Sequence, residues 1–379
     1  MDDDVLLMDP GPVQVAREVR EAGARPLVSH RSPEFEATHA RCQRGIAAAF
    51  GTETDPVLVN GNGWMGVETG MAGVLNPDDE VLAIQTGQFG TENGDIAEHY
   101  AGTVRRLDAA WGASVDLDAV RAELERGADA VTMAHCETST GVVNPVREVA
   151  SLAREHDALL FVDGVSSVGG EPFAFDEWGV DVAATASQKA LGGPPGISAL
   201  ALSEPARERV DAANCPFSLN LADHLDELER NQTPSTAPVQ TYYSLAEAVA
   251  PLVDDGVEAR IERCRRLAAG IRAGTGALGL DPFAEPADHS KLSNTVQAVT
   301  LPEGVAERDV LDGLADRGVS VRGGLGRLQG GMLRIATMGS SIDGDDVVRA
   351  VGALGETLAA LDAAACSPDA AREAARDAL

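Results

Sequence analysis

The residue with the most evident chemical potential in this sequence is a lysine, Lys189. It follows an apolar run that ends in small polar residues, and it precedes a loop of glycine and proline that extends to Gly196. The chain has few lysines and very many acidic residues, which makes this position unusual. Upstream, the apolar run 159–162 ends in the carboxylate of Asp163. Two neighbouring buried strands that bring an acid and a lysine to one edge of a sheet would form a cofactor site.

Four parts of the sequence together suit one cofactor chemistry. A lysine amine can form a Schiff base with an aldehyde, which is the chemistry that pyridoxal phosphate requires. A nearby carboxylate can pair with the protonated pyridine nitrogen, the glycine-rich start of a helix can bind the phosphate, and an aromatic ring can stack on the pyridine. In this sequence the amine is that of Lys189, the carboxylate that of Asp163, the glycine-rich helix start the Gly61–Trp64 turn, and the aromatic ring that of Phe89. Each alone also has an ordinary structural explanation, so the prediction rests on their joint occurrence.

The elements that must position these residues alternate between strand and helix. Apolar and β-branched runs predict strands at 57–60, 81–84, 103–107, 130–134 and 158–162, with helical segments between them. This alternation is typical of βαβ units and predicts an α/β fold with a mostly parallel sheet. The run that ends at Ser203 predicts a strand returning antiparallel, since the connection before it is too short for a crossover helix. Ligands of such sheets bind at the carboxyl ends of the strands, where the polar clusters lie.

At 379 residues the chain is longer than one ordinary core requires, and we expect three parts. These are an N-terminal arm at residues 1–20, a large domain at 21–255 and a small C-terminal domain at 256–379. One long helix from Tyr242 through Arg272 is expected to link the two domains. After Leu280 the pattern of short strands and helices becomes α+β, and the last residues, 367–379, form either a short helix or a frayed tail.

Composition excludes several classes of function. The formal net charge of −30 argues against binding to a nucleic-acid backbone, which requires basic patches. The acidic residues are scattered over the helices, which favours the solvated surface of a halophilic protein over a site for a basic partner. No apolar run of about 18 residues predicts a membrane span, and the acidic N-terminus lacks signal-peptide features, so a cytoplasmic location is expected. The five cysteines are widely spread, which predicts free thiols and no metal site.

The segments around Asp163 and Lys189 also have a recognisable form. The stretch FVDGVSSVGG at 161–170, followed by SQKALGGPPG at 187–196, resembles the class V aminotransferases, and most closely the alanine–glyoxylate / serine–pyruvate aminotransferase family. The resemblance covers nearly the whole chain and includes motifs at 10–12, 30–35, 137–142, 323–326 and 333–335. It implies fold type I of the pyridoxal-phosphate-dependent transferases. In that fold a large domain holds a mostly parallel, seven-stranded-type sheet, and a smaller α+β domain follows it.

The same resemblance implies a role for each matching residue. Lys189 would form the Schiff base and move the substrate proton, Asp163 would bind the pyridine nitrogen, and Val165 would pack on the ring. The phosphate would be held by Gln188 and by backbone N–H groups at Asn62, Gly63 and Trp64. The other implied contacts are a ring stack from Phe89, a hydroxyl from Thr138 near the phenolic oxygen, a phosphate contact from Thr236 of the partner subunit, and substrate contacts from Gly11 and Arg334. A homodimer with a shared active site is therefore expected.

The implied reaction is transamination between a small amino acid, such as alanine or serine, and a 2-oxo acid, such as glyoxylate or pyruvate. The sequence departs from the family where Phe89 replaces a common tryptophan, Trp64 a histidine and Thr233 a tyrosine. An aspartate- or phosphonate-type aminotransferase, another pyridoxal phosphate lyase and a non-catalytic acidic binding protein are the alternatives. A cysteine desulfurase is a further alternative that needs a mobile thiol near the substrate, and no cysteine lies between Cys264 and Cys366.

Overall fold

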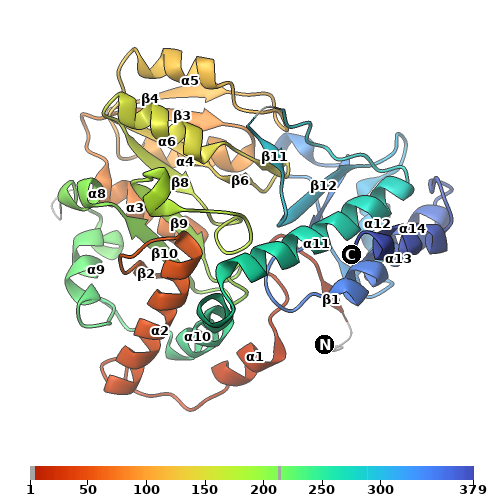
Figure 1. Cartoon of the computed structure of the whole chain (residues 1–379), viewed down its shortest axis with the longest axis horizontal. Coiled ribbons are helices and arrows are strands. Elements are labelled where there is room, and N and C mark those ends of the chain that lie inside the picture. The colour runs from red at the N-terminus through yellow and green to blue at the C-terminus, as the bar shows by residue number, and fades with distance from the viewer. Residues whose placement is uncertain (1–4, 212–214, 288) are drawn as a thin grey trace.

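The computed structural model describes residues 5–211, 215–287 and 289–379, and a seven-stranded sheet lies at its centre (Figure 1). Across the sheet the strands follow the order β2 (Val57–Asn60), β10 (Ile197–Leu202), β9 (Val182–Ala186), β8 (Leu159–Asp163), β5 (Ala130–Ala134), β3 (Glu80–Gln85) and β4 (Thr103–Asp108). Only β10 runs antiparallel to its neighbours, and the other strand pairs of this sheet are parallel. The predicted α/β fold and the antiparallel return are both confirmed.

Helices cover both faces of the sheet, which is why every residue of the inner strands β5, β9 and β10 is buried, whereas the edge strand β4 is more exposed. One face packs against α2 (Pro33–Phe50), α5 (Leu117–Leu124), α6 (Val146–Glu155) and α10 (Val239–Asp254), and the other against α3 (Gly63–Val74), α4 (Gln88–Ala97) and α9 (Leu221–Leu228). The strands alternate between these cores: Val182 belongs to one cluster and Ala183 to the other. Ser32 accepts a hydrogen bond from the Phe35 N–H, so the N-cap expected for α2 is present.

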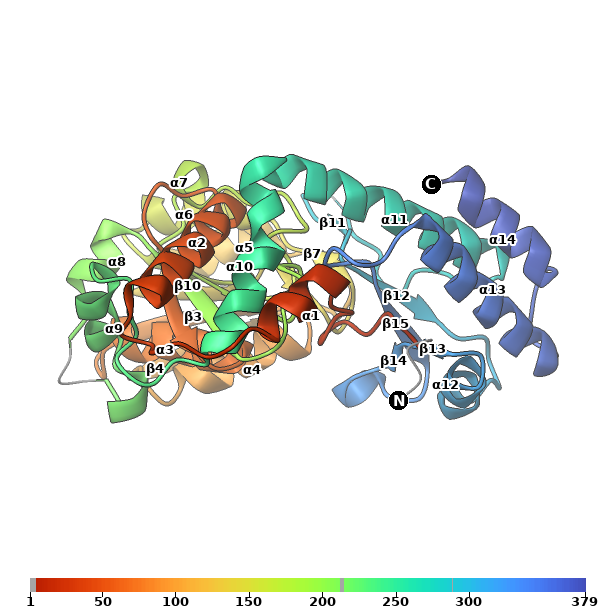
Figure 2. The same ribbon diagram turned by 90° about the horizontal axis from the view of Figure 1, so that it is seen from below.

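A smaller α+β lobe lies beside this sheet (Figure 2). Its antiparallel sheet has the order β12 (Val296–Thr300), β15 (Met332–Ala336) and β14 (Arg322–Gly323). Its helices are α11 (Val257–Ala277), α12 (Glu307–Ala315), α13 (Gly344–Ala360) and α14 (Pro368–Asp377). The N-terminal segment joins it, because β1 (Leu6–Leu7) pairs in parallel with β13 (Val319–Ser320) and Met8 is buried in the same core. We call this the small lobe, and the central sheet with α2 to α10 the large lobe.

The single linking helix expected from Tyr242 through Arg272 is wrong. Two helices, α10 and α11, occupy this region and meet at Gly256, whose φ of +87° is a left-handed conformation that glycine adopts without strain. The chain turns there, and α11 then runs from the large lobe into the small lobe (Figure 2). A second connection is the small sheet β11 (Lys291–Leu292), β7 (Val142–Val143) and β6 (Cys136–Glu137), which brings the approach to β12 against the large lobe.

The remaining helices are short: α1 (Arg17–Gly23), α7 (Phe175–Trp178), α8 (Glu204–Glu208), and the 3₁₀ turns η1 (Phe217–Leu219) and η2 (Gly326–Leu328). The C-terminal residues form helix α14, which packs on α13 and α11, so the alternative of a frayed tail is wrong. Within the described ranges, no helix combines the length and apolar character needed to cross a membrane.

Candidate active site

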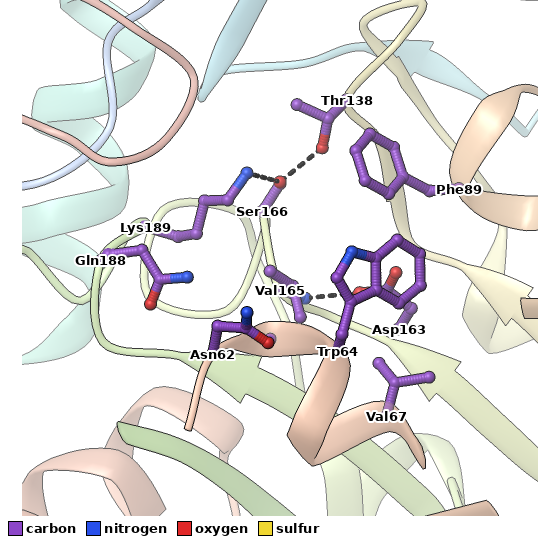
Figure 3. Close-up of a pocket in the computed structure, with 11 residues that line it drawn as sticks. Asn62, Trp64, Val67, Phe89, Thr138, Asp163, Val165, Ser166, Gln188 and Lys189 are labelled. Carbon is purple, nitrogen blue, oxygen red and sulfur yellow. Dashed lines mark hydrogen bonds between the residues drawn. The ribbon is translucent and has the colours of Figure 1, made fainter. Parts of the chain in front are cut away.

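The carboxyl ends of β8 and β9 bring the predicted acid and lysine to one pocket. Asp163 is the last residue of β8 and pairs with Ala134 of β5 and Ala184 of β9, while Lys189 follows β9 by three residues. The pocket has about 550 Å³ of empty space (Figure 3). It is lined by Asn62, Gly63, Trp64, Val67, Phe89, Thr138, Asp163, Val165, Ser166, Gln188 and Lys189. Lys189 and eight other predicted residues therefore line this pocket, because the sheet topology brings them together.

The amine of Lys189 is held by the N-terminal segment. Nζ donates a hydrogen bond to the Pro10 carbonyl at 2.5 Å and lies 3.4 Å from Ser166 Oγ. Burial lowers the pKa of Lys189 to about 8, an effect that the nearby Asp163 carboxylate partly opposes. Gly11 passes so close that a Cβ there would lie 2.5 Å from Lys189 Cε, and its φ of +110° also requires glycine. An amine with this pKa is partly neutral near neutral pH, as a nucleophile or base must be.

The carboxylate of Asp163 is buried, with 6% of its surface exposed. Its Oδ1 accepts a hydrogen bond from the Val165 N–H at 2.9 Å. Burial raises the pKa of Asp163 to about 6, although the hydrogen bond from Val165 favours the charged form. At neutral pH the group therefore remains an anion with more than ordinary basicity, which suits it to hold a protonated ring nitrogen.

Helix α3 points its N-terminus into the same pocket. Asn62 is its N-cap and accepts a hydrogen bond from the Met65 N–H at 3.3 Å. The preceding N–H groups, those of Gly63 and Trp64, have no carbonyl partner within a helix and are available to an anion. A Cβ on Gly63 would lie 3.1 Å from Val165 Cγ1, so glycine lets the helix start approach the floor of the pocket. The sequence predicts a phosphate site at this helix start, and the position of these N–H groups at the pocket suits that prediction.

One wall of the pocket is aromatic. The rings of Trp64 and Phe89 are stacked, with centroids 5.9 Å apart and an angle of 25° between their planes. The Phe89 ring also lies 5.9 Å from Lys189 Nζ. From the sequence we expected only the backbone of Trp64 to contribute, but its indole lines the pocket as well (Figure 3).

Three functional features escaped the sequence analysis. Ser166 lies between Lys189 and Thr138 and makes a short hydrogen bond with the Thr138 hydroxyl. The fully buried carboxylate of Glu137 accepts hydrogen bonds from the N–H groups of Phe89 (3.3 Å) and Gly90 (3.0 Å), which fixes the start of α4. Val67 completes the lining. Glu137 belongs to the motif at 137–142, which points to a function only through the family resemblance, and no sequence pattern distinguishes Ser166 from the adjacent Ser167.

Three predicted residues lie outside the lining of this pocket. Arg334, on β15, is 5% exposed and donates from Nε to the Gly323 carbonyl at 2.8 Å and from Nη1 to the Thr138 carbonyl at 3.4 Å. Burial lowers the pKa of Arg334 to about 10, which still leaves it charged at neutral pH. Gly11 lies against the side chain of Lys189, as described above. The exposed Thr236 lies beside Asn60, whose Nδ2 donates to the Thr236 carbonyl at 3.4 Å.

The residues present fit pyridoxal phosphate. A buried carboxylate, an amine of lowered pKa, a helix N-terminus and an aromatic wall surround one space, and each matches a different part of that molecule. The Oε1 atom of Gln188 is buried without a hydrogen-bond partner among the described residues, so this amide also retains capacity for a polar ligand.

Comparison with known proteins agrees with this geometry. Residues 16–349 match the family described as aminotransferase class-V. The chain is 34% identical to the L-aspartate–glyoxylate aminotransferase of Paracoccus denitrificans, over 88% of this chain and 86% of that protein. It is 31% identical to the alanine–glyoxylate aminotransferase of Callithrix jacchus, over 93% of this chain and 87% of that protein. The crystal structure of ureidoglycine–glyoxylate aminotransferase from Bacillus subtilis superposes with a TM-score of 0.91 at 30% identity, covering 99% of this chain and 97% of that one.

A lysine and a carboxylate at the rim of this sheet, in a chain with these likenesses, define an aminotransferase of fold type I. The chain belongs to the class V aminotransferase family. Membership implies pyridoxal phosphate as the cofactor and an amino acid and an oxo acid as substrates. The family, the fold and the enzyme class expected from the sequence are confirmed.

Proposed function

We propose that this aminotransferase moves an amino group from a small amino acid, such as alanine or serine, to glyoxylate or pyruvate. The observation that carries the proposal is the meeting of the Lys189 amine and the Asp163 carboxylate in one pocket beside the N-terminus of α3. Glyoxylate is named as a substrate of all three relatives described above, while their donors differ. This pattern supports glyoxylate as the acceptor more strongly than any one donor.

Lys189 is the proposed catalytic base and attachment point. Pyridoxal phosphate, when bound, supplies an aldehyde for the lysine amine and a ring that accepts the electrons released when the substrate loses its Cα proton. With its pKa lowered to about 8, the Lys189 amine is partly neutral near neutral pH, so it could bond to the cofactor and carry the Cα proton of the substrate. Lys189 is partly buried, which limits the access of water to Nζ and favours proton transfer between lysine and substrate.

The other residues are proposed to hold and orient the cofactor and the substrate. Asp163 keeps the ring nitrogen protonated, and Val165 and Phe89 pack against the ring. The N–H groups at Asn62, Gly63 and Trp64 bind the phosphate with Gln188. Thr138 places its hydroxyl near the phenolic oxygen. Arg334 binds the substrate carboxylate in the two-pronged manner that a guanidinium allows, and Gly11 gives the substrate room beside Lys189.

We also propose that two copies of the chain share each site. Thr236 is exposed and lies outside its own pocket, as a residue would that serves the phosphate of the other subunit. The proposal is tested by light scattering together with the variant T236A, which is expected to weaken cofactor retention without changing the mass of the dimer. A monomer that is fully active would contradict it.

Two alternatives have different support. A cysteine desulfurase is disfavoured, because Cys136, two residues before the pocket residue Thr138, is 3% exposed and burial raises the pKa of its thiol to about 12. An aspartate donor keeps support from the relative in Paracoccus denitrificans. A panel of alanine, serine, glycine and aspartate as donors, against glyoxylate, pyruvate and 2-oxoglutarate as acceptors, decides between the small and the acidic donor.

The central test of the proposed function is the variant K189A. The purified wild-type protein should show the absorption band of lysine-bound pyridoxal phosphate and should transaminate. K189A should lose both, with a fall in kcat of at least about a thousandfold, because both half-reactions use the same amine. A K189A variant with full activity would contradict the proposed function.

We further propose that the enzyme is cytoplasmic and, on the basis of its net charge of −30, that it is adapted to high salt. Screening by salt weakens repulsion among the acidic side chains, so resistance to unfolding should rise with KCl concentration. Greater stability in low salt would refute the adaptation.

A further inference from the structure

A row of two buried hydroxyls ends on the amine of Lys189. Ser166 Oγ lies 3.4 Å from Lys189 Nζ and makes a short hydrogen bond with Thr138 Oγ1 (Figure 3). Both hydroxyl residues are 3% exposed, so bulk water does not replace these contacts. The Pro10 carbonyl, the other partner of Nζ, can only accept a hydrogen bond. Ser166 is therefore the neighbour of Lys189 that can both accept and donate.

This difference matters because a lysine that carries a proton must be held in two charge states. An ammonium group only donates, whereas a neutral amine also needs a donor for its lone pair. When Lys189 is charged, it donates to Ser166, which donates onward to Thr138. When Lys189 is neutral, Thr138 can donate to Ser166, which then donates to the amine. The row reverses without any heavy atom moving.

We infer that Ser166 is a positioning residue for Lys189, whose reversible hydroxyl holds Nζ in both protonation states and links it to Thr138. The inference rests on the proposed role of Lys189 and goes beyond it, because the proposed function requires only the lysine itself.

The backbone of Ser166 is fixed from the small lobe. Thr295, just before β12, donates from Oγ1 to the Ser166 carbonyl at 2.8 Å. Thr295 is itself in contact with Ser293 Oγ at 2.9 Å, and Ser293 donates to the buried carboxylate of Glu171, also at 2.9 Å. All of these residues are fully or almost fully buried. The serine hydroxyl is therefore aimed by a hydrogen-bonded cluster in which both lobes take part, and not by its own rotamer preference alone.

Other charged or titratable groups also act on Lys189. Asp163 on β8 favours the ammonium form, whereas Arg334 on β15 disfavours it. The Cys136 thiol on β6 is neutral where Lys189 titrates, because burial raises its pKa to about 12. Glu137 on β6 acts on both Asp163 and Arg334. Removal of one neutral hydroxyl leaves all of these groups in place. A change in the titration of Lys189 in such a variant is then attributable to the hydroxyl.

The test compares S166A with S167A. Ser167 is the adjacent buried serine, and its hydroxyl donates to the Gly164 carbonyl at 3.3 Å and not to the lysine, so S167A is a matched control. The chain has two lysines, Lys189 and Lys291, which makes amine labelling simple. The full-length apoprotein is labelled with a trace of acetic anhydride from pH 6 to 11, and mass spectrometry compares Lys189 with Lys291 in each sample.

We expect the labelling pKa of Lys189 to fall by about 0.5–1 unit in S166A, because the charge-assisted bond that the ammonium loses is stronger than the neutral bond that the amine loses. The cofactor-loaded S166A enzyme should lose about tenfold in kcat with little change in KM. S167A should match the wild type in both measurements. A labelling pKa in S166A equal to that of the wild type overturns the inference.

A second pair of variants keeps the inference testable if S166A fails to fold. T295V removes the hydroxyl that fixes the Ser166 backbone, and T295S keeps it. T295V should shift the labelling pKa of Lys189 in the same direction by a smaller amount, and T295S should not; equal values for the two variants count against the inference. A wild-type protein that binds no pyridoxal phosphate would instead refute the proposed function, so the two failures are distinguishable.

Discussion

The large lobe and the small lobe contribute to one site through different kinds of structure. In the large lobe, Asp163 and Lys189 stand at or just beyond the ends of two central strands, and the neighbouring strands on either side are buried. In the small lobe, Arg334 lies in a three-stranded sheet beside the loop 323–331, which contains five glycines. The large-lobe part of the site, which we call the rigid half, is held by a sheet that cannot shift without disrupting a core. The small-lobe part, which we call the adjustable half, depends on a loop of low intrinsic order.

One carboxylate organises that loop. Glu307, the first residue of α12, accepts hydrogen bonds through Oε2 from the N–H groups of Gly324 (3.0 Å) and Gly330 (2.9 Å). The loop reaches the large lobe where Arg327 stacks over the Trp111 ring at 3.9 Å. The comparison shows that the proposed cofactor contacts belong to the rigid half and the proposed carboxylate contact to the adjustable half. Variants of Arg334 and of the loop 323–331 should therefore change substrate binding and leave cofactor binding intact.

The largest effect that would sharpen this comparison is expected from Arg334. Truncation in R334A should lower kcat/KM about a hundredfold, because it removes the charged partner of the substrate carboxylate. R334K should recover only part of this loss, since an ammonium lacks the planar fork of the guanidinium. Steady-state kinetics with the best donor measures both values, and the cofactor absorption band should be unchanged. Loss of the bound cofactor in R334A would break the division between the two halves.

A smaller effect is expected from Glu307. E307Q keeps the shape of the side chain but replaces one acceptor oxygen with a donor and removes the charge, so the glycine loop should become less ordered. We expect KM for the amino donor to rise about three- to tenfold with little change in kcat. D309N, an exposed position in the first turn of the same helix, is the control and should behave as wild type. A fall in kcat alone would show that the loop acts on the chemistry instead.

Sequence reasoning was strongest for the rigid half, for a physical reason. The end of a parallel strand is a position in the fold as well as in the sequence, so Asp163, Thr138 and Lys189 converge once the strands are recognised. Side-chain direction within a loop has no such rule, which is why Ser166 was not separated from Ser167. Glu307 was also missed, because a carboxylate at the start of a helix ordinarily serves only the helix dipole.

The break between α10 and α11 was missed for a different reason. Apolar periodicity continues on both sides of Gly256, and a single glycine within a helical pattern only weakens the prediction of a helix. The turn is decided by tertiary packing, since α10 packs against α2 in the large lobe and α11 against α13 and α14 in the small lobe. The sequence therefore indicates that helices are present here, and the packing decides where one ends.

The last prediction concerns stability instead of activity and tests whether the rigid half stores strain for function. Lys189 has its pKa lowered from 10.5 to about 8 in the folded chain, so the unfolded chain binds the proton more tightly. The stability of the apoprotein should therefore rise with pH between about 8 and 10.5, and below pH 8 the full destabilisation should be present. K189M should remove that pH dependence and stabilise the apoprotein at pH 7 by about 1–2 kcal/mol, less than full burial would give because the side chain keeps some solvent contact.

Urea unfolding of the apoproteins at pH 7 and pH 10 measures this difference. K291M is the control, for which we expect the opposite change in the free energy of unfolding. Lys291 lies 3.6 Å from the buried carboxylate of Glu171, so its removal takes away a cation that pairs with this carboxylate and should destabilise the fold. The two substitutions should thus change the free energy of unfolding in opposite directions. Burial disfavours the charged form of Lys189, whereas the charge of Lys291 stabilises a buried carboxylate. A K189M apoprotein no more stable than wild type at pH 7 would show that the large lobe accommodates its catalytic amine without strain, and the contrast between the lobes would then rest on substrate binding alone.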